Sequence, residues 1–252
     1  MGAKIKALRA GMPAAMTRAL HLVFPPRCIA CSEAVGDDFG LCGPCWRETP
    51  FLTGLCCDQC GAPLPGEGTG DDRCDDCLTL PRPWGRGRAA LAYDGTARRL
   101  VLALKHGDRL DLVPPMAGWL HRAAGPILEP GMLIAPIPLH RLRLLKRRYN
   151  QSALLSAKLA TRAGVDHCPD LLQRIRATPS QDHRSRAERF ANLDGSIRVA
   201  PRRTDLVQGR HVLLVDDVMT SCATFTAATR ACLAAGAANV SVLSLARVAK
   251  DA

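Results

Sequence analysis

The chain has 252 residues, of which 47% are hydrophobic and 23% charged, and this composition excludes a wholly disordered protein. At this length one large domain or two smaller ones are both compatible with a sizeable core. Lysine and arginine outnumber aspartate and glutamate by 34 to 23, so the formal net charge is +11 and anionic partners are expected. Aromatic residues make up only 4% of the chain, which does not indicate a stacking platform for single-stranded nucleic acid.

The N-terminal segment is basic and partly apolar, as signal peptides are. Its apolar stretch is broken by Pro13, Arg18 and His21, and no small-residue cleavage site follows. No stretch of the chain approaches the length of about 18 consecutive apolar residues that membrane insertion needs. We therefore expect residues 1–24 to form an amphipathic helix that packs on the protein, and we expect a cytoplasmic protein.

Cysteines are concentrated near the N-terminus. Of the 12 cysteines, eight form four Cys-x-x-Cys pairs in two blocks, the first with Cys28, Cys31, Cys42 and Cys45, the second with Cys57, Cys60, Cys74 and Cys77. Two thiolates separated by two residues share one tight turn, and a second such pair completes a tetrahedral zinc site. Without an export signal, metal binding is favoured over disulfides. We predict two structural zinc ions, one in each block.

The spacing leaves alternatives open. The ligands could be crossed between the two blocks, and Cys56 could replace its neighbour or remain a spare thiol. An iron–sulfur cluster is the main competitor of zinc. Redox chemistry is less favoured because no thioredoxin-like strand precedes the pairs. Four cysteine ligands leave no open position for a catalytic water, so the predicted zinc sites are structural.

The character of the sequence changes near residues 81–83. Cysteines, glycines and prolines without clear periodicity precede this point, and alternating strand-like and helix-like segments follow it. We therefore divide the chain into an N-terminal helix over residues 1–24, a cysteine-rich domain over residues 25–83 and an α/β domain over residues 84–252.

Hydrophobic patterns predict the elements of the α/β domain. Strands are expected at 88–93, 132–137, 171–174, 196–199, 211–215 and 239–246. Helices are expected at 96–106 and 113–124, from a cap at Asn150 to about residue 163, and over an alanine-rich segment that ends near Ala235. Strands that alternate with helices predict a parallel or mainly parallel sheet covered on both faces.

The segment 211–224 has a pattern typical of phosphate-binding sites. Four apolar residues are followed by Asp216 and Asp217, and then by a loop of small and hydroxyl residues that opens a helix. The amide groups and dipole of a helix N-terminus bind phosphate, and the carboxylates could hold sugar hydroxyls or a metal ion. Ligands of open α/β sheets also bind at the carboxyl ends of strands.

This segment resembles the 5-phosphoribosyl-1-pyrophosphate (PRPP) signature of type I phosphoribosyltransferases. The resemblance implies that Asp216 and Asp217 contact the ribose hydroxyls and that magnesium arrives chelated largely by PRPP. It also implies that the 5′-phosphate lies in a loop, here called the phosphate loop, that consists of Thr220, Ser221, Cys222, Ala223 and Thr224.

Further segments occur in an order that resembles the ComF family of phosphoribosyltransferase-related competence proteins, in the version with a double zinc ribbon. They are FPPRC at 24–28, YDGTARRLVLALKHGDR at 93–109, PIPLHRLRLLKRRYNQS at 136–152, ATPSQ at 177–181 and RFAN at 189–192. The resemblance implies a type I phosphoribosyltransferase-like fold and an association with DNA uptake in natural transformation. It implies binding of Mg-PRPP or a related compound, with transfer of phosphoribose to an unidentified acceptor. The alternative is a non-catalytic, zinc-dependent competence factor that binds single-stranded DNA or proteins of the uptake machinery.

Two basic segments lie in the α/β domain. The first follows a predicted strand and contains Arg141, Arg143, Lys146, Arg147 and Arg148. Phosphoribosyltransferases bind pyrophosphate at this place, whereas an ordinary solvated basic face is the alternative. The second segment, 174–189, corresponds by resemblance to the flexible loop that closes over PRPP, and disorder is its alternative. Lys105 and His183 receive no catalytic role.

The phosphate loop departs from the family pattern Thr-Thr-Gly-Ala-Thr. Ser221 keeps a hydroxyl, but Cys222 replaces a glycine where the backbone approaches phosphate and could need a conformation that glycine favours. In one interpretation the Cys222 side chain points into the packing of the following helix and ligand binding is intact. In the other, the thiol lies at the helix N-terminus among basic residues, its pKa falls and the thiolate competes with the phosphate.

Overall fold

The structure, a computed structural model, describes residues 21, 24–68, 70–140, 144–145, 147–176, 193 and 195–248. The predicted N-terminal helix therefore lies almost entirely outside the described residues, as does the predicted closing loop (residues 174–189) from residue 177 onward. Within the described ranges, none of the helices has the length and apolar character needed to cross a lipid bilayer.

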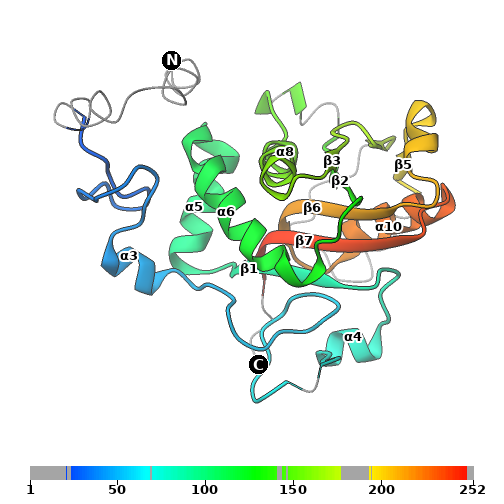
Figure 1. The fold of residues 1–252 in the computed structure, drawn as a ribbon, viewed down its shortest axis with the longest axis horizontal. Coiled ribbons are helices and arrows are strands. Elements are labelled where there is room, and N and C mark those ends of the chain that lie inside the picture. The colour runs from blue at the N-terminus through cyan, green and yellow to red at the C-terminus, as the bar shows by residue number, and fades with distance from the viewer. Residues whose placement is uncertain are drawn as a thin grey trace.

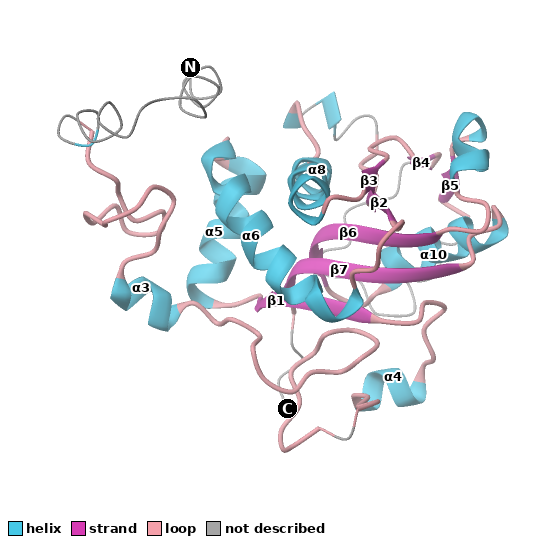
Figure 2. Cartoon of the chain, viewed as in Figure 1, coloured by secondary structure: helices cyan, strands magenta, loops and turns pink. Residues whose placement is uncertain are grey.

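A five-stranded sheet forms the centre of the molecule (Figures 1 and 2). Its order is β1-β7-β6-β2-β3, and all four strand pairs are parallel, as the sequence predicts. The strands are β1 (Gly87–Ala92), β2 (Leu133–Pro136), β3 (Asp166–His167), β6 (His211–Met219) and β7 (Asn239–Arg247).

Helices cover both faces of this sheet (Figure 1). One face carries α5 (Gly95–His106), α6 (Val113–Ala124) and α8 (Gln151–Ala163), and the other carries α10 (Ala223–Ala234). Short 3-10 turns occupy Leu110–Leu112, Gly125–Ile127 and Pro201–Leu206. Successive residues of β6 serve the two cores in turn, since Leu213 packs with the first three helices and Leu214 packs with α10.

Local signals place the ends of α8 where the sequence predicts them. The side chain of Asn150 accepts a hydrogen bond from the Ser152 amide at 3.1 Å, which caps the helix. At the other end Gly164 adopts a φ of 67°, the left-handed conformation that terminates helices.

The structure differs from the prediction in the small strands. β4 (Leu172–Arg174) and β5 (Ile197–Val199) pair only with each other, as an antiparallel ribbon apart from the main sheet. The place beside β2 is taken by β3 instead. With two residues, β3 is too short to show the alternation by which strands are recognised in a sequence.

The central strand β6 is also longer than predicted. Instead of ending at Val215 it continues through both aspartates to Met219, because the equally long β7 pairs with it as far as Arg247. On its other side, β2 ends at Pro136, which lies opposite Val215. Pro136 and Pro138 have no amide hydrogen to continue the ladder. From Asp216 onward, β6 therefore has a strand neighbour on one side only.

The two cysteine blocks lie against opposite faces of the sheet. In the first block, Trp46 of α3 (Gly43–Glu48) packs its ring at 4.5 Å, in a tilted arrangement, on that of Phe51, which meets Trp119 of α6 edge to face at 5.3 Å. Phe51 also bridges to Leu91, so this part of the chain covers the edge strand β1. The second block, which includes α4 (Asp75–Thr79), packs with Trp84 on the α10 side.

Candidate functional site

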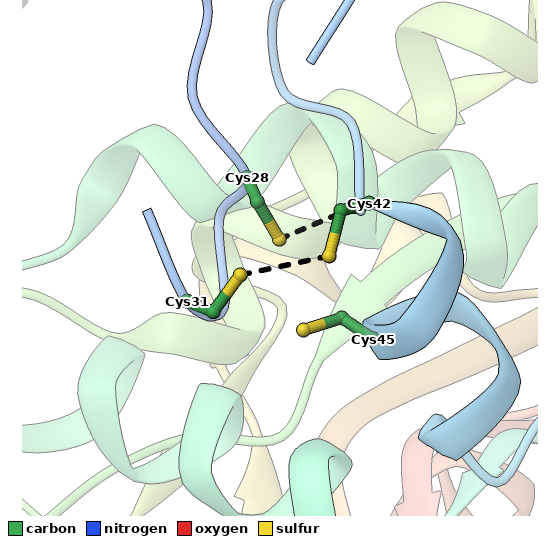
Figure 3. Close-up of side chains that lie close together, drawn as sticks. All are labelled: Cys28, Cys31, Cys42 and Cys45. Atoms are coloured by element: carbon green, nitrogen blue, oxygen red, sulfur yellow. Dashed lines mark hydrogen bonds between the residues drawn. The ribbon is translucent and has the colours of Figure 1, made fainter. Parts of the chain in front are cut away.

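The eight paired cysteines form two clusters that fit zinc. Within each cluster the four sulfur atoms lie within 4.8 Å of one another, and Figure 3 shows those of the first cluster pointing toward a common centre. The first cluster consists of Cys28, Cys31, Cys42 and Cys45, and the second cluster consists of Cys57, Cys60, Cys74 and Cys77. The Sγ atoms of Cys31 and Cys42 are 3.5 Å apart, and those of Cys60 and Cys74 are 3.6 Å apart. A tetrahedron with Zn–S distances of about 2.3 Å requires separations of about 3.8 Å.

The two clusters decide both alternatives that the cysteine spacing leaves open, namely crossed ligands and a role for Cys56. Each cluster draws its ligands from one block, so the crossed arrangement is wrong. Cys56 belongs to neither cluster, and its backbone instead forms an isolated bridge with Pro63. A double zinc ribbon with two four-cysteine sites is the arrangement that the structure supports.

Asp216 and Asp217 lie at the point where the sheet changes its direction of winding. From β2 the chain crosses through α8 to β3 on one side, and from β6 it crosses through α10 to β7 on the other. The carboxyl ends of β2 and β6 are adjacent, and crevices at such a point are where open α/β sheets bind ligands. The early end of β2 leaves this edge of β6 open beside both aspartates.

The carboxyl group of Asp216 is held by neighbouring donors. Its Oδ1 atom accepts hydrogen bonds from the Ser152 hydroxyl at 2.8 Å and from the Asp217 amide at 2.9 Å. Burial and the neighbouring Asp217 carboxylate raise the pKa of Asp216 to about 7, although Ser152 and Lys105 act in the opposite direction. Functional sites often contain a carboxyl group that titrates near neutral pH, and Asp216 is such a group near the carboxyl end of a central strand.

Lys105 supplies the positive charge of this group. Its Nζ atom lies 3.1 Å from Oδ1 of Asp217, and both side chains are largely buried, at 18% and 13% exposure. The end of α5 that carries Lys105 is anchored by residues at the start of α8 and just before it. Tyr149 donates to the Leu104 carbonyl at 2.8 Å, and Gln151 donates to the Lys105 carbonyl at 3.3 Å.

Sequence reasoning assigned no role to Lys105 or Ser152. The signal that could have found them is the resemblance itself, because Lys105 falls in the matched segment 93–109 and Ser152 ends the matched segment 136–152. Their positions relative to the aspartates follow from the topology, since α5 and the start of α8 both meet the sheet near the end of β6.

The phosphate loop joins β6 to α10. Thr220 is exposed, whereas Ser221 and Thr224 are half-buried. The first turn of α10 leaves backbone amides without partners inside the helix, and the side chain of the N-cap residue Cys222 makes no capping hydrogen bond to them. Free amides at a helix N-terminus are suited to an anionic ligand.

Cys222 adopts the glycine-type conformation that its position suggests. Its φ is 70° and its ψ is −2°, in the left-handed region, and its side chain is 3% exposed. It packs in the same core cluster as Phe225 and Met219. The side chain therefore points into the packing, as in the first interpretation of this substitution, while Arg82 and Arg247 are near enough to interact with its charge and provide the basic surroundings of the second.

Of the basic segment after β2, the structure describes Arg147 and Arg148, while Arg141, Arg143 and Lys146 lie outside the described residues. The pyrophosphate-binding role of this segment stays a prediction. Near its start the structure has a cavity of about 490 Å³, lined by Pro138, His140, Arg174, Arg198 and neighbouring residues. Among the residues that the structure describes, the lining includes no carboxylate side chain, and the cavity has space for an anionic or polar group.

Comparisons with known proteins give matches in both parts of the chain. Residues 19–78 match the model of a double zinc ribbon domain. Among solved structures, the glutamine PRPP amidotransferase of B. subtilis is 16% identical, with a TM-score of 0.36, and the match covers 52% of this chain and 25% of that one. The hypoxanthine-guanine phosphoribosyl transferase of L. donovani is 18% identical, with a TM-score of 0.30, over 52% of this chain and 67% of that one.

Similarity to curated proteins extends over most of the chain. The DNA utilization protein YhgH of Salmonella typhimurium is 32% identical over 234 residues, which cover 90% of this chain and 99% of the relative. YhgH of Escherichia coli K12 is 30% identical over 237 residues, with the same coverage. Competence protein F of Haemophilus influenzae is 26% identical over 227 residues, which cover 88% of this chain and 96% of the relative. The chain therefore belongs to the ComF family of competence and DNA utilization proteins, in the form that carries a double zinc ribbon.

Proposed function

We propose that this protein binds a phosphoribosyl compound, Mg-PRPP or a close relative, at the carboxyl end of β6 and uses it in DNA utilization. The observation that carries the proposal is the placement of Asp216 and Asp217 on an open strand edge, next to the N-terminus of α10. The aspartates would accept hydrogen bonds from the ribose hydroxyls, and the amides of residues 220–224 would hold the 5′-phosphate.

Without a ligand, the two aspartates interact with side chains of the protein itself. Lys105 neutralises Asp217, and Ser152 donates to Asp216. A bound ribose would replace part of these contacts, and Lys105 would remain close enough to compensate the negative charge of a phosphorylated ligand. Magnesium would enter with PRPP and supply charge neutralisation to the pyrophosphate. Mg²⁺ prefers oxygen ligands, and the carboxylates of Asp216 and Asp217 offer such oxygens.

If the bound compound reacts, the chemistry is phosphoribosyl transfer. The bond between the anomeric carbon and the pyrophosphate oxygen breaks, an acceptor nitrogen forms the new bond to that carbon, and the acceptor loses a proton. Arg147 and Arg148 would stabilise the leaving pyrophosphate, together with Arg141, Arg143 and Lys146 of the same segment. The cavity of about 490 Å³ beyond β2 is our candidate for the acceptor's place.

Calorimetric titration with Mg-PRPP tests the proposal. We expect saturable binding by the wild type and a loss of at least about tenfold in affinity when Asp216 and Asp217 are both replaced by asparagine. Asp166→Asn is the matched control, since this aspartate lies on β3 with a 71% exposed side chain, paired to Arg210. Equal affinity in the wild type and the double variant would reject the site. Pyrophosphate release with candidate acceptors then separates an enzyme from a binding protein.

A second candidate function is DNA binding without catalysis. The net charge of +11 and the family's association with DNA utilization favour it. Binding that rests on lysine and arginine contacts to phosphates weakens steeply with salt and does not need the aspartates. Retention of salt-sensitive binding to single-stranded DNA in the double asparagine variant would support this function independently of PRPP.

A further inference from the structure

Two arginines are buried between the second cysteine cluster and the phosphate loop. Arg247, the last residue of β7, is 5% exposed, and Arg82 is 7% exposed. Burial of a guanidinium group is costly unless its donors find partners, so the partners indicate what the group holds together.

One nitrogen of Arg247 holds the backbone where the phosphate loop begins. Its Nη1 donates to the carbonyl oxygens of Met219 at 3.2 Å and Thr220 at 2.5 Å, and also to that of Val248 at 2.9 Å. Met219 ends β6 and Thr220 is the first residue of the loop. Arg247 therefore fixes the point at which the loop leaves the sheet.

The second terminal nitrogen of Arg247, Nη2, lies near the second cluster. Nη2 lies 3.9 Å from Sγ of Cys60, and Nε of Arg82 lies 3.5 Å from Sγ of Cys77. A zinc ion bound by four thiolates carries a net negative charge, which the two guanidinium groups would offset. Hydrogen bonds to ligand atoms also orient them and tune metal affinity.

The packing of Trp84 also connects the second cluster with the start of α10. Trp84 donates its indole N–H to the carbonyl of Gln59, between two cysteines of the second cluster, at 2.6 Å. Its ring meets Phe225 in the first turn of α10 at 6.2 Å. By contrast, in the described part of the chain no arginine donates to a sulfur of the first cluster, which packs near the opposite face of the sheet.

We propose that the second cluster is a working part of the ligand site. Its zinc positions the phosphate loop through Arg247, so metal occupancy there and ligand binding at the loop strengthen one another, while the first cluster has no such coupling. Thermodynamic linkage requires the ligand to raise the zinc affinity by the same factor by which zinc raises the ligand affinity. The inference rests on the proposed function for the identity of the ligand, whereas the connection between zinc and loop exists without it. Arg247 acts as a positioning residue in this scheme.

The connection can be tested without any ligand. In the full-length protein, alkylation of Cys222 measured by mass spectrometry reports opening of the loop. We expect labelling about tenfold faster in Cys74→Ser, which impairs the second cluster, and in Arg247→Met, but an unchanged rate in Cys31→Ser, which impairs the first. Arg247→Lys keeps the charge and should restore part of the protection. Equal Cys222 labelling in Cys74→Ser and Cys31→Ser would overturn the connection.

The coupling is measured by equilibrium competition with a zinc-selective chelator at increasing Mg-PRPP. We expect PRPP to raise the zinc affinity of the second site about tenfold and to leave the first site unchanged. The variants Cys31→Ser and Cys74→Ser each retain one intact site and assign the two affinities. In Arg247→Met the effect of PRPP on zinc should vanish.

The two proposals fail in different ways. If PRPP does not bind the wild type, the proposed function falls and the Cys222 rates still judge the link between zinc and loop. If PRPP binds but the zinc affinity of the second site does not respond to it, the coupling is overturned and the proposed function stands.

Discussion

The carboxyl group of Asp216 is where pH should act on this fold. Burial and the charge of Asp217 raise its pKa from 3.8 to about 7. Because the folded value lies above the unfolded one, the native state binds more protons between the two. The contribution of Asp216 to the free energy of unfolding therefore falls as the pH rises from about 4 to about 7, and no further above that.

Asparagine removes this effect while keeping the shape of the side chain. Its amide oxygen can still accept from the Ser152 hydroxyl and the Asp217 amide. One pKa unit corresponds to about 1.36 kcal/mol. We therefore expect Asp216→Asn to raise the free energy of unfolding by about 2 kcal/mol at pH 5.5 and by about 4 kcal/mol at pH 8.

Urea unfolding followed by circular dichroism at several pH values measures this difference. The range should stay above about pH 5.5, because zinc-binding thiolates protonate in acid. Asp166→Asn is the control and should follow the wild type at every pH, since its carboxylate is exposed and pairs with Arg210 at the surface. If the stability difference between the wild type and Asp216→Asn does not change with pH, the electrostatic reasoning is wrong.

Three further predictions follow from the described contacts. Metal analysis should find about two zinc ions per chain in the wild type and the same number in Cys56→Ser, because Cys56 lies outside both clusters; a lower number in the variant would make Cys56 a ligand. Asn150→Ala should lower the free energy of unfolding by about 1–2 kcal/mol in denaturant titrations, since it removes the helix cap and the hydrogen bond to the Ile137 carbonyl. Asn150→Asp should lose less, because it keeps the cap. Cys222→Gly should be more stable than Cys222→Ala by about 1 kcal/mol, because only glycine relieves the left-handed backbone; the reverse order would show that the strain is unimportant.

Much of the fold could be predicted because its signals are local. Apolar runs mark β6 and β7, Asn150 and Gly164 mark the ends of α8, and paired cysteines mark each metal cluster. These features depend on neighbours within one turn or one short loop. The short β3 and the separate ribbon of β4 and β5 could not be predicted in this way. Their places depend on which strand occupies the free edge of β2.

The partners of the candidate site depend on topology over long stretches of chain. Ser152 and Asp216 are 64 residues apart, and Arg247 and Cys60 are 187 residues apart. In the sequence Arg247 is only a charged residue at the end of an apolar strand, where solvent exposure would be the ordinary expectation. The parallel pairing of β6 with β7 sets Arg247 opposite Met219, and the docking of the second cluster on the α10 side brings Cys60 to the same guanidinium group. The second cysteine cluster, which looks like part of an independent module in the sequence, thereby shares Arg247 with the start of the phosphate loop.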